Sequence, residues 1–238
     1  MKKIIFISIF LVIGLHAEEI YATFNVEADR SANLAFSSSG IVDSVMADIG
    51  TEVKQGDTLA TLQNDDLKAM LHVAQTALKY AKKEYERQVK VKNIIDRSRF
   101  DQYAFKYENA KVQLQYQQAL LDKTILKAPF DGVIFAKSVE EGDVVSGAMI
   151  RTIFKIQSLH QRKLVLEFDQ KYWNVVRTGD HFSYKIDGSD AVHQGIISKI
   201  YPSVDSSKRK IRAEAETKDV MVGLFGDGTV ITSGKKQD

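Results

Sequence analysis

The side chains that most often carry out chemistry are sparse in this sequence, and their spacing does not suit catalysis or metal binding. The chain of 238 residues has no cysteine and five histidines, His16, His72, His160, His181 and His193. No two histidines have the spacing that places a pair of metal ligands on one helix face. Because there is no cysteine, disulfides, thiolate metal sites and thiol nucleophiles are excluded. We therefore expect no catalytic site, no metal and no cofactor, and we predict that the protein is not an enzyme.

Two other patterns that could do chemistry have a structural explanation. Asp65 and Asp66 could act as paired carboxylates, but they follow Asn64, a plausible N-cap, where the helix dipole favours negative charge. The sequence GDG at 226–228 is typical of a turn, and no phosphate-binding loop is present. The formal net charge of +2 gives no reason to expect nucleic acid as a partner.

Basic side chains are concentrated near the middle of the chain, where they could bind an acidic partner. They are Arg87, Lys90, Lys92, Arg97 and Arg99. The same residues could equally form a solvated helix face, and the sequence leaves both interpretations open.

The elements that carry these basic residues follow a helical pattern. The seam positions are spaced 4 and 3 residues apart in alternation, as in a heptad repeat: Leu67, Leu71, Ala74, Leu78, Ala81 and Tyr85, then Phe100, Tyr103, Tyr107, Ala110, Leu114, Gln117 and Leu121. Because the pattern blurs at 92–98, we predict an antiparallel α-helical coiled-coil hairpin over 64–126, roughly 45 Å long at 1.5 Å per residue. A seam this narrow gives the two helices only a small hydrophobic core of their own. We therefore expect an external partner to pack on the hairpin. A hairpin folded back on its own domain is the alternative.

Two segments on either side of the helical region repeat one half-motif. The segments are SGIVDSVMADIGTEVKQG (39–56) and APFDGVIFAKSVEEGDVV (128–145). One constant offset places Gly40 on Gly132, Gly50 on Gly142 and Val53 on Val145. Chance duplication is the alternative, but the shared register predicts that 39–62 and 128–156 pair to close one split β-sandwich around the inserted hairpin. Its expected structural turn glycines are Gly40, Gly50, Gly56, Gly132 and Gly142.

The remaining sequence predicts short strands. The segments 163–168, 181–186, 195–201, 209–216 and 228–231 alternate or carry β-branched residues, with a short helix at 170–176. Together with 21–37 they predict a small antiparallel β-barrel over 21–37 and 157–232, followed by a flexible tail at 233–238. The fold class is therefore mixed β and α.

The first residues have the features of an export signal. Lys2 and Lys3 precede the apolar run Ile4–Leu15, and Ala17 is a small residue at a plausible cleavage point. The run is shorter than the ~20 residues that a membrane-spanning helix needs. We predict a signal peptide at 1–17 and a periplasmic location, with an uncleaved N-terminal anchor as the alternative.

The order of these elements resembles that of the periplasmic adaptor proteins, or membrane fusion proteins, of the HlyD-like type. The resemblance rests on SGIVDSVMADIGTEVKQGDTLATL (39–62), LKAPFDGVIFAKSVEEGDVVSGAMI (126–150) and GIISKIYPSVDSSKRKIRAEAE (195–216). It implies a lipoyl-like sandwich and an adaptor in a tripartite efflux pump that exports drugs or toxic compounds and gives antibiotic resistance. Such an adaptor associates with an inner-membrane transporter, with the resistance-nodulation-division (RND) type favoured, and with a TolC-type outer-membrane channel. It also implies self-association into a ring, commonly hexameric.

Two alternatives to the efflux adaptor remain open at this point. One is an adaptor of an ABC exporter or of a type I secretion system. The other is a lipoyl-like carrier or scaffold. A carrier of this fold needs a lysine in the turn that the hairpin replaces here, so we expect no attached cofactor. Family members also have a membrane-proximal β domain that holds the transporter, and we expect it to be absent or vestigial in this sequence.

The resemblance further implies a channel-binding tip. Relatives that dock on TolC-type channels carry Arg, three residues, Leu, six residues and Ser, which Arg87, Val91 and Ser98 match with Val in place of Leu. Arg87 offers a fork of donors, Val91 offers apolar area, and Ser98 could cap the second helix. The alternatives are a solvated arginine, a valine of the hairpin seam and a serine that only caps the helix.

Overall fold

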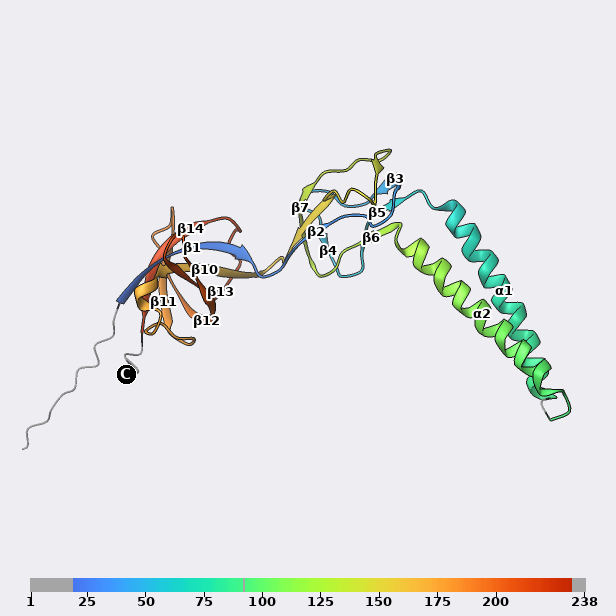
Figure 1. The fold of residues 1–238 in the computed structure, drawn as a ribbon. Coiled ribbons are helices and arrows are strands. Elements are labelled where there is room, and N and C mark those ends of the chain that lie inside the picture. Colours follow the sequence, from blue (N-terminus) through green and yellow to red (C-terminus); the bar gives the residue numbers. More distant parts are fainter. Residues whose placement is uncertain (1–18, 92, 233–238) are drawn as a thin grey trace, which may run out of the picture. The chain divides into compact units, whose positions relative to one another are not determined.

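The computed structural model describes residues 19–91 and 93–232 (Figure 1). The signal peptide predicted at 1–17 and the flexible tail predicted at 233–238 lie outside these residues. The described chain forms two compact units. One contains the chain up to Asp29 and from His160 onward, and the other is Arg30–Leu159.

The first unit is a closed antiparallel barrel. Its strands follow the order β1 (Glu19–Ala28), β10 (Gln161–Asp169), β13 (Lys210–Lys218), β12 (Val192–Asp205), β11 (His181–Ile186) and β14 (Phe225–Ile231). Alternate residues of β1 point inward, as the period of a strand requires, so Ile20, Ala22, Phe24 and Val26 are buried. The helix predicted at 170–176 is present only as the 3₁₀ turn η1 (Gln170–Tyr172).

The second unit contains a sandwich of two four-stranded sheets. One sheet has the order β2 (Ser31–Leu34), β9 (Phe154–Gln157), β7 (Gly132–Lys137) and β4 (Glu52–Val53). The other has the order β6 (Ile125–Lys127), β5 (Thr58–Leu62), β3 (Gly40–Val45) and β8 (Val144–Val145). Apolar side chains from both sheets form one core.

The two half-motifs pair with each other in a reciprocal manner. Strand β3 of the first half pairs with β8 of the second, and β4 of the first pairs with β7 of the second. The backbone bonds repeat this exchange, since Gly50 donates to Ile134 (2.8 Å) and the equivalent Gly142 donates to Val42 (2.9 Å). Each half therefore supplies the hydrogen-bonding partners that the other lacks, and the predicted mutual pairing is confirmed.

Two boundaries differ from the sequence-based prediction. The barrel was expected to include all of 21–37, but β2 pairs with β9 and lies in the sandwich. The sandwich was expected to resume at residue 128, but β6 already pairs with β5. In both cases a short strand with no strong pattern of its own is assigned by its neighbours in the sheet.

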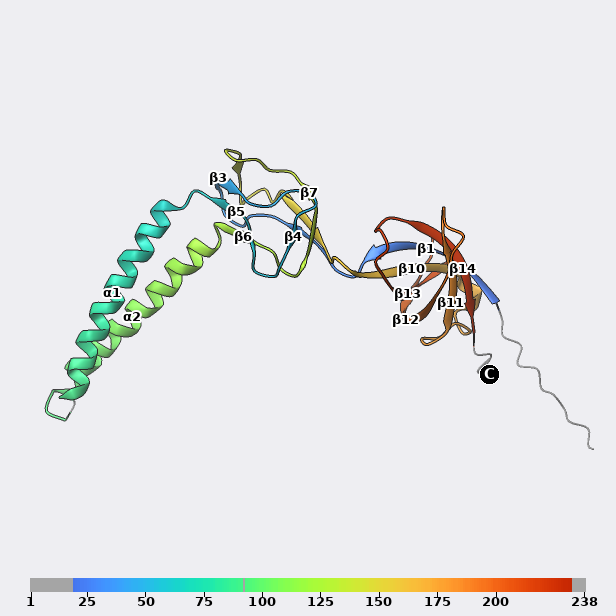
Figure 2. The same ribbon diagram turned by 180° about the vertical axis from the view of Figure 1, so that it is seen from behind.

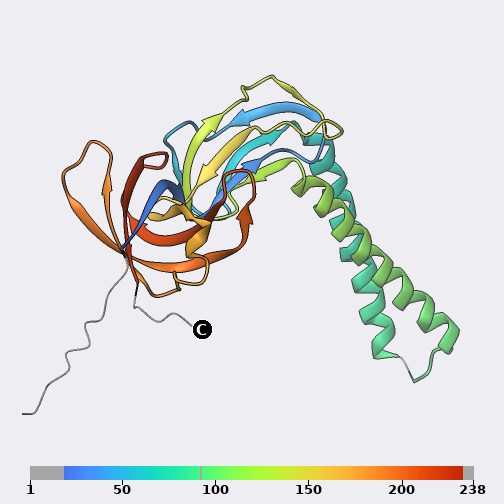
Figure 3. The same cartoon turned by 60° about the vertical axis from the view of Figure 1, so that its left-hand side comes forward.

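The inserted region consists of two helices, α1 (Asp65–Lys90) and α2 (Arg97–Asp122), which lie side by side (Figure 3). Figure 2 shows from behind that α1 follows β5 and that α2 leads to β6. Every predicted seam residue is buried or half-buried, so the predicted contact faces are confirmed. The supercoil of a true coiled coil stays a prediction. Among the described residues, no helix is long and apolar enough to cross a membrane.

Candidate partner-docking site

The structure brings the three predicted tip residues to one end of the helical pair. Arg87 lies in the last turn of α1, Val91 directly follows that helix, and Ser98 is the second residue of α2. All three residues are exposed. Val91 is 42% exposed, so part of its apolar side chain is accessible to a partner. An incoming partner could therefore reach all three, which is the minimum that a docking site requires.

Local hydrogen bonds fix the turn between the helices. The carbonyl of Val91 accepts the N–H groups of Ile94 (2.9 Å) and Ile95 (3.1 Å), and the Asp96 carboxylate accepts the N–H of Arg99 (3.1 Å). Asp96 is thus the N-cap of α2. The prediction that Ser98 caps this helix is wrong, because Ser98 already lies within the first turn.

An exposed ion pair holds Arg87 only weakly. Its guanidinium donates to the carboxylate of Glu84, which also accepts from the side-chain amide of Gln88 (3.4 Å). The Arg87 side chain is 70% exposed, so the pair is screened by solvent and adds little stability. The guanidinium can therefore exchange Glu84 for acceptors on a partner at low cost.

Stacked aromatic rings support the tip from below. The Tyr85 ring lies 5.3 Å from that of Tyr107, nearly parallel to it, and 5.7 Å from that of Phe100. Such contacts stabilise by more than their buried area alone. They hold the C-terminal part of α1 against the first turns of α2, so the tip residues keep a defined relative position.

Ile94 is a tip residue that the sequence-based reasoning missed. It is 89% exposed, more than the other large apolar side chains of the described chain. The available signal was an isoleucine within the stretch where the heptad pattern fails. Together with Val91 it gives the tip an apolar surface that water does not favour.

The opposite end of the helical pair is fixed by a buried polar contact. The Asn64 side-chain amide donates to the Thr124 hydroxyl (2.9 Å), which donates to the Leu121 carbonyl (2.6 Å). Asn64 occupies the N-cap position of α1 as predicted, but its side chain makes no capping hydrogen bond. It connects the two helix ends instead, which confirms that the helices run antiparallel.

The predicted turn glycines have two different roles. Gly50, Gly56 and Gly142 have φ near +90°, which favours glycine. Gly40 and Gly132 instead open strands β3 and β7, and only at Gly132 does the backbone of a neighbouring strand exclude a side chain. A Cβ on Gly132 would lie 2.3 Å from the carbonyl oxygen of Gln157.

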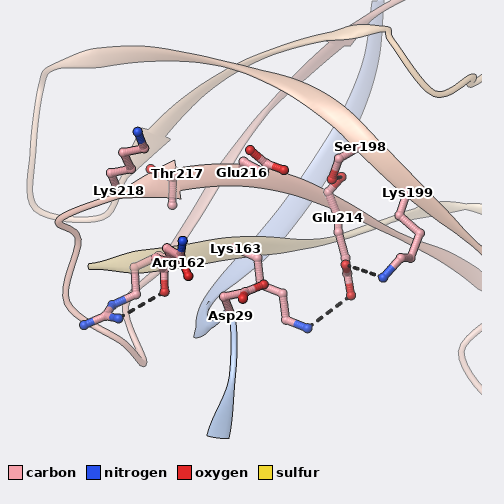
Figure 4. A pocket seen from close by; sticks show the side chains of 10 residues that line it. Asp29, Arg162, Lys163, Ser198, Lys199, Glu214, Glu216, Thr217 and Lys218 are labelled. Carbon is pink, nitrogen blue, oxygen red and sulfur yellow. Dashed lines mark hydrogen bonds and ion pairs between the residues drawn. The ribbon is translucent and has the colours of Figure 1, made fainter. Parts of the chain in front are cut away.

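A second candidate site is a polar pocket of about 520 Å³ on the barrel (Figure 4). At its centre Glu214 accepts from Lys163 (3.2 Å), Lys199 (3.1 Å) and the Tyr201 hydroxyl (2.7 Å). Burial disfavours the charge on Glu214, but these donors outweigh burial and lower the pKa of Glu214 to about 2.

This cluster joins three neighbouring strands of the barrel. Lys163 comes from β10, Lys199 and Tyr201 from β12, and Glu214 from β13 between them. The bond to Glu214 also raises the pKa of Tyr201. Since each group already has a partner, the arrangement fits a structural tie better than a binding site.

No metal centre competes with these sites in the described part of the chain. Residues 19–91 and 93–232 contain no group of three or more His, Asp or Glu side chains arranged to hold a metal ion.

Comparison with protein families and curated proteins gives consistent results. Residues 30–157 match the family described as CzcB-like, barrel-sandwich hybrid domain. The chain is 26% identical over 203 residues to the cobalt-zinc-cadmium resistance protein CzcB of Cupriavidus metallidurans. This match covers 78% of the chain but only 38% of CzcB, so the chain spans well under half the length of that relative.

Solved structures share the fold at low sequence identity. A MacA-MexA chimeric protein containing the Pseudomonas aeruginosa MexA α-hairpin domain superposes with a TM-score of 0.80 at 19% identity, covering 90% of this chain and 79% of that one. MacA from Actinobacillus actinomycetemcomitans gives a TM-score of 0.72 at 17% identity, covering 91% and 79%. These likenesses concern the fold alone.

Proposed function

The chain belongs to the CzcB-like barrel-sandwich hybrid family, which confirms its resemblance to the periplasmic adaptor proteins, and we propose that it is the adaptor subunit of a tripartite efflux pump. In this role it acts in the periplasm beside the inner membrane and joins a transporter to an outer-membrane channel. The proposed role is mechanical and involves no catalysis.

One observation carries the proposal: a sandwich closed by two separated segments, with a helical pair inserted between them. The inserted helices bury few side chains. Among the described residues of this unit, none covers the exposed apolar side chains of Val91 and Ile94 at the tip. A helical arm of this kind is suited to contact another protein.

We assign channel binding to the tip residues Arg87, Val91 and Ser98, with Ile94 as an added apolar contact. The exposed guanidinium of Arg87 can donate to carbonyls or carboxylates of a channel. Val91 and Ile94 would bury apolar area against the channel helices. A TolC-type channel is the proposed partner.

The transporter, the cargo and the oligomer are finer parts of the same proposal. We favour an RND-type transporter and a hexameric ring of adaptors, with an ABC exporter or a type I secretion system as the alternative. The name of the relative CzcB adds cobalt, zinc and cadmium ions to drugs and other toxic compounds as candidate cargo. A lipoyl-like carrier is disfavoured because α1 and α2 occupy the place of the turn that would carry the modified lysine.

A charge reversal at the tip tests channel docking. We expect Arg87→Glu to abolish resistance to the exported compound in cells that depend on this adaptor, because a carboxylate would repel the acceptors that a guanidinium binds. Adaptor abundance, measured by immunoblotting, should stay unchanged.

A matched control separates docking from a general charge effect. Lys79→Glu makes the same change on an exposed position of α1, eight residues and therefore about 12 Å from Arg87. It should leave resistance intact. Full resistance with Arg87→Glu would remove the tip assignment.

Crosslinking identifies the partners directly. A photoreactive residue at Val91 should capture the outer-membrane channel, whereas the same residue at Val112, exposed on α2, should capture it much less. Recovery of only lipoylated or enzyme partners at Val91 would favour the carrier alternative.

A further inference from the structure

One end of the barrel carries both apolar and basic side chains. We call this end the rim and define it by six exposed residues: Lys171, Trp173, Arg177, Ile196, Lys208 and Ile231. Strand pairing shows that the rim is one end, since Ile231 is opposite both Glu19 and His181, and His181 is opposite Ile196. Figure 1 shows β1 beginning and β14 ending there.

The segment 170–180 lies at the rim, with some side chains directed into the barrel core and others into solvent. Val176 is buried in the barrel core, and Tyr172 and Val175 pack against that core. Backbone bonds attach the segment at both ends, from Gln170 to the Arg209 carbonyl (3.1 Å) and from Gly179 to the Ile197 carbonyl (2.8 Å). The segment is therefore held in place, although it lacks regular helix.

Trp173 projects from this fixed segment into solvent. It is the single tryptophan of the chain and is 71% exposed, while Ile196 is 54% and Ile231 is 38% exposed. Exposed aromatic and aliphatic side chains at one end of a domain are typical of an interaction surface. Tryptophan in particular prefers the boundary between lipid and water, where its ring is apolar and its N–H remains hydrated.

The rim also carries three basic residues. Lys171, Arg177 and Lys208 are exposed, and Lys208 is already 3.4 Å from the Glu167 carboxylate. Carboxylates also lie at this end of the barrel: Asp169 accepts the N–H of Lys171 (2.9 Å), Asp180 accepts that of Arg177 (2.7 Å), and the exposed Glu19 is opposite Ile231. The two backbone bonds fix the loop but leave these carboxylates charged, so the attraction to lipid phosphates depends on the exposed basic side chains.

The described part of the chain begins at this same rim, with Glu19 of β1. Residues 1–18 join β1 at Glu19, and their sequence contains Lys2, Lys3 and the apolar run Ile4–Leu15. A segment of that composition is directed to a membrane, whether it is later removed or retained.

We propose that the rim rests on an anionic phospholipid bilayer, with Trp173 at headgroup level and Lys171 and Arg177 beside the lipid phosphates. This inference rests on the proposed function, which places the chain beside the inner membrane. It adds a direct lipid contact that needs neither transporter nor channel. Such a contact would orient the barrel before the pump assembles.

The single tryptophan makes the test direct, because all indole fluorescence of the full chain comes from Trp173. Vesicles of phosphatidylglycerol and phosphatidylethanolamine should shift its emission to the blue, and brominated acyl chains should quench it. Vesicles of phosphatidylcholine alone should have little effect. Added salt should weaken the response, since the attraction is partly electrostatic.

Paired variants show whether the basic residues act as proposed. Lys171→Gln with Arg177→Gln should weaken vesicle affinity by roughly fivefold for each charge removed. Lys106→Gln with Lys111→Gln removes the same charge from exposed positions of α2 and should leave the affinity unchanged.

Three results would overturn the proposal. The first is co-sedimentation with vesicles while the Trp173 emission stays that of water, which would assign binding to residues 1–18 alone. The second is an equal loss of affinity in both double variants. The third is a blue shift that depends on protein concentration without vesicles, which would assign the rim to a second copy. None of these results bears on channel crosslinking at Val91, so the two proposals can fail separately.

Discussion

The sandwich and the helical pair belong to one compact unit but are stabilised in opposite ways. The sandwich buries large side chains from both sheets almost completely, including Leu59, Leu62, Ile134, Phe154 and Ile156. In α1 and α2 the buried side chains of the described residues are only Leu71, Ala74 and Leu121. Burial of apolar area is the main favourable term in folding, so the sandwich carries most of the stability of this unit.

Because of this difference, we expect the sandwich to determine the stability of the unit and the tip of the helical pair to determine partner binding. A substitution in the sandwich should unfold the unit and remove every function with it. A substitution at the tip, far from the buried core, should change partner binding and leave the fold intact. The predictions below test this separation and compare it with the barrel, and the main variants run from the largest expected loss of stability to the smallest.

Gly132→Ala should destabilise the sandwich most. Its Cβ would lie 2.3 Å from the Gln157 carbonyl oxygen, so β7 and β9 would have to move apart. We expect the free energy of unfolding to fall by about 3 kcal/mol, measured by urea denaturation.

Gly195→Ala is the matched control for that prediction. Gly195 is also a buried strand glycine, but a Cβ there would meet its nearest atoms at 3.6 Å, an ordinary contact. The change should be under about 1 kcal/mol. Equal losses in both variants would show that close backbone approach is not the reason for Gly132.

Glu214→Gln should weaken the barrel by roughly 2 kcal/mol at pH 7. The pKa of Glu214 is lowered from 4.5 to about 2 in the folded protein, so its stabilisation is complete above pH 4.5 and disappears as the pH falls toward 2. Urea denaturation at several pH values should show the two proteins converging in acid. A difference independent of pH would contradict the ionic role of Glu214.

Asn64→Leu should loosen the base of the helical pair by about 1 kcal/mol, the usual value for one hydrogen bond. The Thr124 hydroxyl keeps its bond to the Leu121 carbonyl, so no buried donor is left without a partner. Hydrogen exchange should quicken in the first turns of α1 while the barrel is unchanged. Gln118→Leu, which removes the exposed bond to Asp122 (3.0 Å), should have little effect.

Arg87→Ala should change the free energy of unfolding by no more than about 0.5 kcal/mol, because it breaks only an exposed ion pair. Its effect should appear instead as weaker crosslinking to the channel. A large loss of stability would place Arg87 in the structural framework and contradict the separation.

Much of the fold follows from local patterns. The period of the seam residues set the two helices, and the shared register of the half-motifs predicted their reciprocal pairing, including the equivalent roles of Gly50 and Gly142. The barrel strands were predicted to within a few residues; the largest differences are at β12 (Val192–Asp205), predicted at 195–201, and at the start of β14 (Phe225–Ile231), predicted at 228–231. The contact of Arg87, Val91 and Ser98 with a channel stays a prediction.

Other features depended on contacts between residues that are distant in sequence. The sequence could not place β2 in the sandwich, because its partner β9 lies more than 100 residues away. Nor did the sequence indicate the Glu214 cluster, whose members come from three strands, or the contact of Asn64 with Thr124. In each case the strand or side chain has several possible partners along the chain, and the tertiary structure determines which one it contacts.

The sequence by itself determined the period of the two long helices and of most strands, the turns at Gly50, Gly56 and Gly142, and the exchange of partners between the two half-motifs. These are properties of residues close together, or of two segments with one register, and they follow from backbone sterics and side-chain period. Tertiary structure alone decided which sheet β2 joins, which donors surround Glu214 and that Trp173 faces solvent while Val176 is buried. Those outcomes depend on long-range packing, because the burial and hydrogen bonding of a residue are determined by all the residues that surround it in the folded chain.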